Sequence, residues 1–505
     1  MANPLYENLF LSHRKNENPF LILSDAKIWT YNQFLLLSSK FSNALIDIGL
    51  NEGDRIAIRI EKSPHALAIY AACVQLGIVF LPLNPAYTMT EVEFFVSDSS
   101  SKLIICDTKN KAQLNLIGKK FGARVMTLNS DGSGTFSDLA LSLNGFSEIC
   151  SRTANDLVAI LYTSGTTGRS KGAMISQKNL LSNAKSLSEF WSFSSRDVLL
   201  HALPIFHTHG LFVATNTCLL VGATMRFYPS FHAETLIRDM PKATTMMGVP
   251  TYYTRLLENK TFTRELVRNI RLFISGSAPL LAETHKKFEK RTGHKILERY
   301  GMTETNMITS NPYHKGRKSG SVGVPLPGVE VKITDPETGE LLKPHVMGMI
   351  EVRGDNVFQG YWNLPEKTAS ELRVDGFFIT GDLGFIDSEG YLHIVGRQKD
   401  LIISGGYNIY PKEIENFLDS FEAIDESAVI GVPHPDLGET VVAILTKNKN
   451  MEIDILGLES AMKKKLASYK KPKSYRIVES LPRNAMGKIQ KNILRQRYKT
   501  IFLTK

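Results

Sequence analysis

Short apolar runs alternate with helical stretches through the first half of the chain, and this alternation limits the possible folds more than any other feature. The strand-like runs occupy residues 55–60, 79–83, 102–106, 157–162, 244–249 and 271–275. Helical stretches follow Pro64 and surround residues 91–97. Such alternation is typical of α/β layering with largely parallel sheets, in which ligands bind at the carboxyl ends of the strands. We therefore predict an α/β fold.

One apolar stretch, residues 66–83, is long enough to be considered as a transmembrane helix. Its local pattern argues against a membrane span. Ser63 and Pro64 are typical of a helix start, and Gly77 is typical of a helix end. The β-branched and aromatic residues at 78–83 then favour a strand. We predict a buried helix, a turn and a buried strand here, and no membrane insertion.

The residue pattern of the sequence changes twice toward its carboxyl end. Short strands with frequent Gly and Pro predict a β-rich subdomain over about residues 319–396. Beyond it, helices are predicted after Pro411 and over 455–466, and strands over 426–431, 440–446 and 475–478. We therefore predict two domains. The large N-terminal domain spans residues 1–396 and contains layered α/β subdomains plus the β-rich subdomain, and a small, mobile α+β domain spans residues 397–505.

The charge of the chain is concentrated at one end. The 505 residues are 43% hydrophobic and 22% charged, which is typical of folded globular proteins. The formal net charge is +10, and residues 451–505 alone contain 14 Lys or Arg against 4 Asp or Glu. A balanced body with one basic end favours an anionic small molecule over a nucleic acid as partner. A solvated basic helix surface is the alternative interpretation.

Four widely separated cysteines, Cys73, Cys106, Cys150 and Cys218, form no CxxC pair and have no His at zinc spacing. We expect them to be reduced thiols of the protein core in a reducing compartment. The first 20 residues lack the basic start and the uninterrupted apolar run of a signal peptide. These features predict a cytoplasmic location.

The strongest chemical motif is LVAILYTSGTTGRSKG at residues 157–172, an apolar strand that enters a loop of glycines and hydroxyls. Glycines allow a tight turn with exposed N–H groups, hydroxyls donate to phosphate oxygens, and basic side chains offset phosphate charge. The loop differs from a Walker A motif because Arg169, and not Lys, follows Gly168. We predict that polyphosphate is bound by Thr163, Ser164, Gly165, Thr166, Thr167, Gly168 and Lys171.

Five motifs together resemble those of the adenylate-forming superfamily of acyl- and aryl-CoA synthetases, luciferases and peptide-synthetase adenylation domains. The first is the loop just described. The others follow in the superfamily's order: YGMTE at residues 300–304, TGD at 380–382, GRQKD at 396–400 and PRNAMGK at 482–488. The resemblance extends nearly from end to end. It implies a carboxylic acid as substrate, with ATP, Mg²⁺ and CoA.

The resemblance assigns roles that also have a physical basis in the side chains. Glu304 with Thr167 would hold Mg²⁺ against the ATP phosphates, since magnesium commonly uses one or two carboxylates plus phosphate oxygens. Asp382 would accept hydrogen bonds from the ribose hydroxyls, and Tyr300 would offer its ring to adenine. The remaining residues implied for this site are Ser277, Ala278, Pro279, Thr303 and Arg397.

The same resemblance implies a reaction in two halves. A carboxylate attacks the α-phosphate of Mg-ATP to give an acyl-adenylate and pyrophosphate, and a CoA thiol then displaces AMP. Lys488 would act in the first half by stabilising charge that develops in the transition state. The small domain would rotate about Lys399 between the halves, so that Ser404, Gly405 and Gly406 line a tunnel for the thiol.

The strings ERYGMTETNMITSN at 298–311 and GYNIYPKEIE at 406–415 resemble malonyl-CoA synthetases more than ligases for acetate, long-chain or aromatic acids. Arg299 is notable because a guanidinium can pair with a second carboxylate. The alternative is a structural salt bridge with Glu298 or Glu304. Other residues suggested for the wall of a short acyl pocket are His207, Thr208, Ser277 and Met307.

We therefore predict an AMP-forming acid–thiol ligase for malonate, with methylmalonate as a close alternative. A CoA ligase for another short- or medium-chain monocarboxylic acid is the second hypothesis, and a luciferase-like oxygenase is more distant. A non-catalytic nucleotide-binding relative would be expected to lack Lys488 or Glu304, and both are present.

Overall fold

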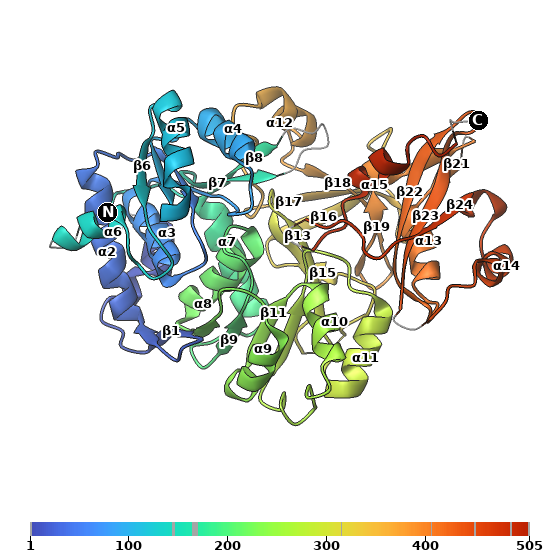
Figure 1. The fold of residues 1–505 in the computed structure, drawn as a ribbon, viewed down its shortest axis with the longest axis horizontal. Helices are drawn as coiled ribbons and strands as arrows, with labels where there is room; N and C mark the ends of the chain where they lie inside the picture. Colours follow the sequence, from blue (N-terminus) through green and yellow to red (C-terminus); the bar gives the residue numbers. More distant parts are fainter. Residues whose placement is uncertain are drawn as a thin grey trace.

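The computed structural model describes residues 3–143, 147–163, 170–314, 316–405, 407–448, 451–484 and 487–502, without the side chain of Lys464. Within these ranges the strands form four sheets. Three sheets make up a large body, and the fourth belongs to a smaller C-terminal lobe, which lies on the right in Figure 1.

A six-stranded sheet forms the N-terminal part of the body, with the strand order β6-β5-β3-β4-β7-β8. Its strands are β3 (Arg55–Arg59), β4 (Val79–Pro82), β5 (Leu103–Cys106), β6 (Arg124–Thr127), β7 (Leu157–Thr163) and β8 (Lys171–Ser176). Helices of this part are α1 (Pro4–Leu9), α2 (Tyr31–Asp47), α3 (Pro64–Leu76), α4 (Met89–Ser99), α5 (Lys111–Phe121) and α6 (Thr135–Ser142). Strands β6 to β7 are parallel and β8 is antiparallel to β7, so the predicted α/β layering is confirmed.

A nine-stranded sheet follows, with the order β15-β14-β13-β12-β11-β9-β10-β1-β2. Its strands are β1 (Pro19–Leu23), β2 (Ile28–Thr30), β9 (Val198–His201), β10 (Thr224–Phe227), β11 (Thr245–Gly248), β12 (Leu272–Ser275), β13 (Leu297–Met302), β14 (Asn306–Ser310) and β15 (Val324–Pro325). Its helices are α7 (Gln177–Phe190), the π-helix η3 (His209–Thr215), α8 (Asn216–Val221), α9 (Ala233–Asp239), α10 (Pro250–Glu258) and α11 (Ala282–Thr292). The central strands are parallel, and β2, β14 and β15 are antiparallel to their neighbours.

The apolar stretch at residues 66–83 folds as its pattern predicts. Ser63 caps α3 by accepting a hydrogen bond from the Ala66 N–H at 3.2 Å, and Pro64 is the first helical residue. Gly77 ends the helix with φ +69°, a left-handed conformation that glycine adopts without strain. Strand β4 then begins at Val79. Among the described residues, no helix is both long and apolar enough to span a membrane.

A four-stranded antiparallel sheet forms the β-rich part, with β16 (Val329–Thr334), β17 (Gly348–Gly354), β18 (Phe378–Ile386) and β19 (Leu392–Arg397), beside α12 (Pro365–Glu371). The C-terminal lobe contains β20 (Ile402–Ser404), β21 (Tyr407–Ile409), β22 (Ile424–His434), β23 (Gly438–Lys447), β24 (Ser474–Ile477), α13 (Pro411–Leu418), α14 (Ile455–Lys465) and α15 (Lys491–Tyr498). Sheet membership changes between β19 and β20. The domain boundary at residues 396/397 stays a prediction.

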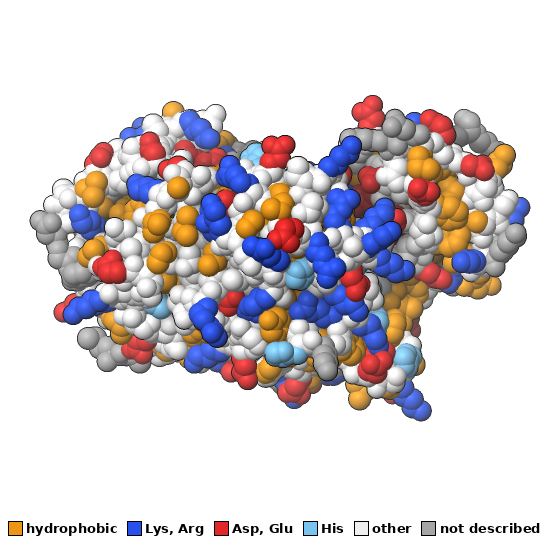
Figure 2. Space-filling view, turned by 90° about the horizontal axis from the view of Figure 1, so that it is seen from below, with side chains coloured by type: hydrophobic (Ala, Val, Ile, Leu, Met, Phe, Trp, Pro, Cys, Tyr) orange, Lys and Arg blue, Asp and Glu red, His pale blue; other side chains and the backbone are white. Residues whose placement is uncertain are grey.

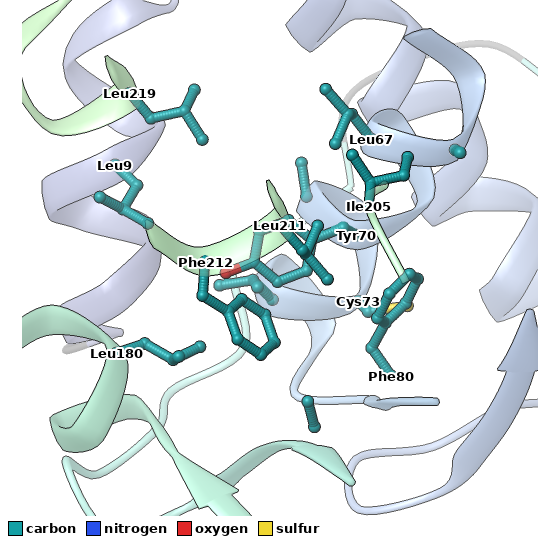
Figure 3. Packing of buried hydrophobic residues seen from close by; sticks show 14 of the residues in the cluster. Leu9, Leu67, Tyr70, Cys73, Phe80, Leu180, Ile205, Leu211, Phe212 and Leu219 are labelled. Atoms are coloured by element: carbon teal, nitrogen blue, oxygen red, sulfur yellow. The ribbon is translucent and has the colours of Figure 1, made fainter. Parts of the chain in front are cut away.

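The largest hydrophobic core joins the two large sheets. Figure 3 shows Leu67, Tyr70 and Cys73 of α3 beside Leu211 and Phe212 of η3. Cys73, Cys106 and Cys218 are buried as predicted, whereas Cys150 is partly exposed. The prediction that all four thiols lie in the core is therefore wrong for Cys150, whose Sγ lies at the surface beside a carboxylate.

Candidate active site

Tyr300 of β13, Asp382 of β18 and Arg397 of β19 lie together where the nine-stranded and four-stranded sheets meet. The Tyr300 hydroxyl donates to Asp382 Oδ2 at 2.5 Å, and Arg397 Nε lies 2.9 Å from Asp382 Oδ1. Strand pairing sets Asp382 opposite Arg397. Burial, followed by the charge of Asp382, raises the pKa of Tyr300 well above its usual value, so its hydroxyl stays a donor. The carboxylate is thus fixed on both sides.

Glu304 is buried beside the two strands that flank the phosphate loop. Thr163 Oγ1 donates to Glu304 Oε1 at 3.4 Å. The Tyr361 hydroxyl lies 3.2 Å from the same oxygen and 2.7 Å from Glu371 Oε2, so it can donate to either carboxylate. Lys171 Nζ lies 3.4 Å from Glu371 Oε2 and 4.1 Å from the centre of the Tyr361 ring. A carboxylate and a lysine therefore stand at the ends of the loop.

Lys488 reaches this region from the C-terminal lobe. It follows Gly487, whose φ is +74°, in a turn that Asn484 closes by donating its N–H to Lys488 O at 2.9 Å and accepting at Oδ1 from the Lys488 N–H at 3.0 Å. The side chain keeps access to solvent, but the protein around it lowers its pKa to about 8. After burial, the charges that act on this pKa are those of Arg397, Asp382, Glu304 and Arg299.

The large body and the lobe meet at a notch on one face of the molecule (Figure 2). Lys and Arg side chains gather on the body beside this notch, with some Asp and Glu among them. A surface of this kind attracts phosphate-bearing ligands. The electrostatics of the notch therefore suit a nucleotide.

Arg299 points to the opposite side of β13 from Tyr300, as alternation along a strand requires. Its side chain is buried, and among the described residues it has no ion pair and no hydrogen-bond partner for Nε and Nη2. Burial lowers the pKa of Arg299 to about 9, which leaves it charged at neutral pH. Neither Glu298 nor Glu304 pairs with it, so the salt bridge held open as an alternative is not formed. A Cβ on Gly276 would stand 2.4 Å from Arg299 Cζ, so only glycine leaves room for the guanidinium.

The segment that follows β9 also carries polar atoms without partners. Within the described part of the chain, His207 Nδ1, Thr208 Oγ1 and His209 Nε2 are buried without a hydrogen-bond partner. Burial, followed by the charges of Lys488 and Arg299, lowers the pKa of His207 to about 3. Ser277 Oγ lies 3.2 Å from His209 Nδ1. The charge of Arg299 acts on the pKa of both His207 and His209, so the two histidines lie near the unpaired guanidinium.

Two family models match the chain. The model described as AMP-binding enzyme matches residues 12–362, and the one described as AMP-binding enzyme C-terminal domain matches residues 413–488. The first match alone covers more than half of the chain. The chain belongs to the AMP-binding enzyme family.

Curated relatives of this AMP-binding enzyme include proteins named for different acids. A long-chain-fatty-acid–CoA ligase of Bacillus subtilis (strain 168) is 34% identical over 91% of this chain and 88% of its own length. A malonate–CoA ligase of Arabidopsis thaliana is 33% identical over 94% of this chain and 85% of its own length. Identity at this level does not choose between the acids.

A solved structure of ATP-bound MatB from Rhodopseudomonas palustris is 50% identical to this enzyme, covers 99% of it and 100% of its own chain, and superposes with a TM-score of 0.97. The apo form of the same protein covers the same share and gives 0.86. Since both comparisons span the whole enzyme, the difference reflects how its parts are arranged. The lobe and body of this AMP-binding enzyme are therefore placed as in the ATP-bound form.

Several residues named from the sequence lie elsewhere or are not described. Ser164, Gly165, Thr166, Thr167, Gly168 and Gly406 lie outside the described residues. Ala278 and Pro279 follow β12 and Ser277, and Thr303 lies in the turn before Glu304. Met307 of β14 packs against the backbone beside Tyr300, since a Cβ on Gly301 would stand 2.6 Å from Met307 Cε. Lys399 lies in the short helix Gln398–Asp400, Ser404 is the last residue of β20, and Gly405 follows it.

Sequence reasoning missed three residues of this site. The sequence held a signal for His209, because it is the second histidine of the HTH string that also contains His207. Tyr361 and Glu371 carry no local signal, since they belong to a loop and to α12, and they approach Glu304 and Lys171 only after the sheets assemble.

Proposed function

We propose that this AMP-binding enzyme is an acid–CoA ligase that activates malonate, with methylmalonate as a close analogue. In the first half-reaction, a carboxylate oxygen of malonate bonds to the α-phosphorus of ATP and pyrophosphate leaves. In the second, the CoA sulfur bonds to the acyl carbon, its proton is released, and AMP leaves with the electron pair of the broken C–O bond. The products are malonyl-CoA, AMP and pyrophosphate.

The buried, unpaired guanidinium of Arg299 is the observation that supports malonate as the acid. A charge buried without a counter-ion is unfavourable, and a second carboxylate on the substrate would supply the missing partner. A guanidinium offers a planar fork of donors that fits a carboxylate. The curated malonate–CoA ligase of similar identity is consistent with this choice.

The nucleotide would lie on the other side of β13. The Tyr300 ring with Ala278 and Pro279 would contact adenine, and Asp382 with Arg397 would hold the ribose. The phosphate loop, with Thr163 and Lys171 at its ends, would bind the phosphates.

Glu304 and Thr167 are the proposed Mg²⁺ ligands. Both described hydrogen bonds of the Glu304 carboxylate end on Oε1, which leaves Oε2 for a cation. One carboxylate with phosphate oxygens and water is a donor set that Mg²⁺ accepts. When bound, the ion would neutralise charge on the ATP phosphates.

Lys488 would stabilise the charge that develops between the acid carboxylate and the α-phosphate. Its position beside Asp382 and Glu304 supports a role in the first half-reaction. Rotation about Lys399 would then withdraw Lys488 and bring Ser404, Gly405 and Gly406 toward the thiol.

Pyrophosphate release measured with malonate, methylmalonate, acetate and butyrate tests the choice of acid. We expect malonate to be preferred by the wild type. Arg299→Ala should lose malonate activity about thirtyfold to several thousandfold, because a buried charge left without its partner costs about 2 to 5 kcal/mol. Activity with acetate should fall far less, since acetate has no second carboxylate.

Gly276→Ala provides a second variant that keeps the guanidinium but moves it. The new methyl group would overlap Arg299 Cζ, so malonate should again be lost selectively. A uniform fall across all acids in both variants would make Arg299 a structural residue. A wild-type preference for a monocarboxylate would favour the activity named for the Bacillus subtilis relative.

A further inference from the structure

Lys62 connects the two large sheets. It lies in the loop between β3 and α3, and its Nζ reaches His201, the last residue of β9 in the nine-stranded sheet. Nζ donates to His201 O and to Leu203 O at 2.8 Å each, and it lies 2.9 Å from His201 Nδ1. These three acceptors match the three N–H donors of an ammonium group, and the centre of the Phe227 ring lies 4.3 Å away. Burial lowers the pKa of Lys62 well below its usual value, whereas the three acceptors favour its charged form.

His201 extends this connection to η3. Burial, followed by the charge of Lys62, lowers the pKa of His201 well below its usual value, so its ring is neutral. A neutral ring that accepts a hydrogen bond at Nδ1 carries its proton on Nε2. Nε2 donates that proton to Gly210 O at 2.9 Å, and Thr215 Oγ1 donates to the same oxygen at 2.9 Å.

Lys62 and His201 together fix both ends of residues 202–209, which we call the acid-pocket segment because it carries Thr208 and the two histidines that lie near Arg299. Lys62 binds carbonyls at its start, and His201 binds Gly210 at its end. The two ends touch, since a Cβ on Gly210 would stand 2.1 Å from Pro204 O.

Leu203 and Ile205 of this segment pack in the largest hydrophobic core, but the packing is incomplete. A cavity of about 80 Å³ lies behind it, lined by Pro204 and Ile205 of the segment, by Phe80 and Ala66 of the opposing elements, and by Lys62 itself. Because a cavity provides no contacts on its open side, the polar anchors of Lys62 and His201 contribute more to the position of the segment than they would in a filled core.

We propose that Lys62 is a positioning residue for the acid. Through His201 it sets where the acid-pocket segment lies relative to Arg299, and it thereby controls the affinity for the acid and not for the nucleotide. This proposal uses the proposed function only for the identity of the acid.

Steady-state kinetics of Lys62→Met test the proposal, because methionine retains the unbranched apolar stem and removes all three donors. We expect the KM for malonate to rise about tenfold to a hundredfold, since a displacement of about 1 Å in a positioning element can cost that much. The KM for ATP should stay at its wild-type value. If Lys62→Met does not fold, Lys62→Gln, which retains two N–H donors on a shorter stem, replaces it.

Arg271→Met is the matched control. Arg271 binds Asp197 through Nε at 2.8 Å and Nη2 at 2.9 Å, just before the opposite end of β9. Its loss should lower thermal stability, as the loss of Lys62 does, without changing the KM for malonate. Equal shifts of both KM values in Lys62→Met, or a malonate KM that follows stability in both variants, would overturn the positioning role.

His201→Leu supplies an independent measurement. Leucine can neither donate to Gly210 O nor accept from Lys62. If the two residues act through one another, the effects of Lys62→Met and His201→Leu on log KM should not add in the double variant. Full additivity would contradict the connection. If the wild type prefers acetate or butyrate, the proposed function fails, and the same comparison made with that acid still decides the role of Lys62.

Discussion

The charges that surround the Lys488 ammonium come from the large body, and they act in opposite directions. Arg397 and Arg299 lower its pKa, whereas Asp382 and Glu304 raise it. Partial desolvation by the protein around Lys488 is the largest influence and leaves the pKa at about 8. A single lysine therefore titrates within the range of ordinary assays, and its role can be tested both by substitution and by pH.

Lys488→Ala removes the charge that faces the developing transition state. We expect adenylation to fall about a hundredfold or more, the usual effect of removing one preorganised donor. Pyrophosphate exchange measures this half-reaction. Thioester formation from preformed acyl-adenylate is the control and should be largely retained, and near-normal exchange in the variant would contradict the role of Lys488.

The pH dependence of the first half-reaction follows from the lowered pKa of Lys488. The ammonium form predominates below about pH 8 and is lost as pH rises through this value. Since kcat/KM reports the ionisations of the free enzyme, kcat/KM for the acid should fall above about pH 8. Lys488→Arg keeps its charge to higher pH, so the residual activity of this variant should show the alkaline limb at higher pH. If the alkaline fall in kcat/KM stays at the same pH in this variant, the fall reports the titration of another group.

Helix α4 shows how a local signal fixes the boundary of an element. The apolar pattern predicts a helix over residues 91–97, and the structure begins it at Met89 with a capping box. Thr88 Oγ1 accepts from the Glu91 N–H at 3.3 Å, and Glu91 Oε2 accepts from the Thr88 N–H at 2.7 Å. The Thr-x-x-Glu spacing in the sequence carries this signal.

Thr88→Ala should lower the free energy of unfolding by about 1 kcal/mol, because it leaves an N-terminal N–H of the helix without its acceptor. Urea unfolding measures the change. Thr90→Ala, in the first turn of the same helix, removes a similar group that does not cap it and should be nearly neutral. Equal losses in the two variants would show that the cap does not stabilise α4.

Strand β18 shows where local patterns are insufficient. The TGD motif at residues 380–382 lies inside β18, which continues to Ile386. The strand is extended because β17 and β19 both pair with it, with register shifts beside Leu383. This pairing, and not the TGD motif itself, sets Asp382 opposite Arg397.

The arrangement of the whole molecule corresponds to the first half-reaction. The enzyme superposes better on ATP-bound MatB than on its apo form, and Lys488 lies beside the candidate site residues of the body. In the mechanism proposed above, the lobe would move before the second half-reaction. The short helix Gln398–Asp400, between β19 and β20, is the connection about which this would happen.

Lys399→Pro should restrict rotation because proline fixes φ at the proposed hinge. We expect adenylation to survive, while thioester formation from preformed acyl-adenylate falls. Pyrophosphate exchange and CoA-thioester formation, measured separately, distinguish these effects. Equal loss of both half-reactions, or of neither, would contradict the hinge.

The sequence by itself determined the elements, the α/β class and the family, because capping residues, apolar periodicity and motifs such as YGMTE are encoded in neighbouring positions. It also named Arg299, but it could not tell a salt bridge from a free cation. Only the tertiary structure decided this. The groups that lie beside the Arg299 guanidinium come from Gly276 and from the strands around β13, and none of the described ones is a counter-ion. The contacts of Tyr361 with Glu304 and of Lys62 with His201 join residues 57 and 139 positions apart, and they exist only because sheet order places distant strands side by side.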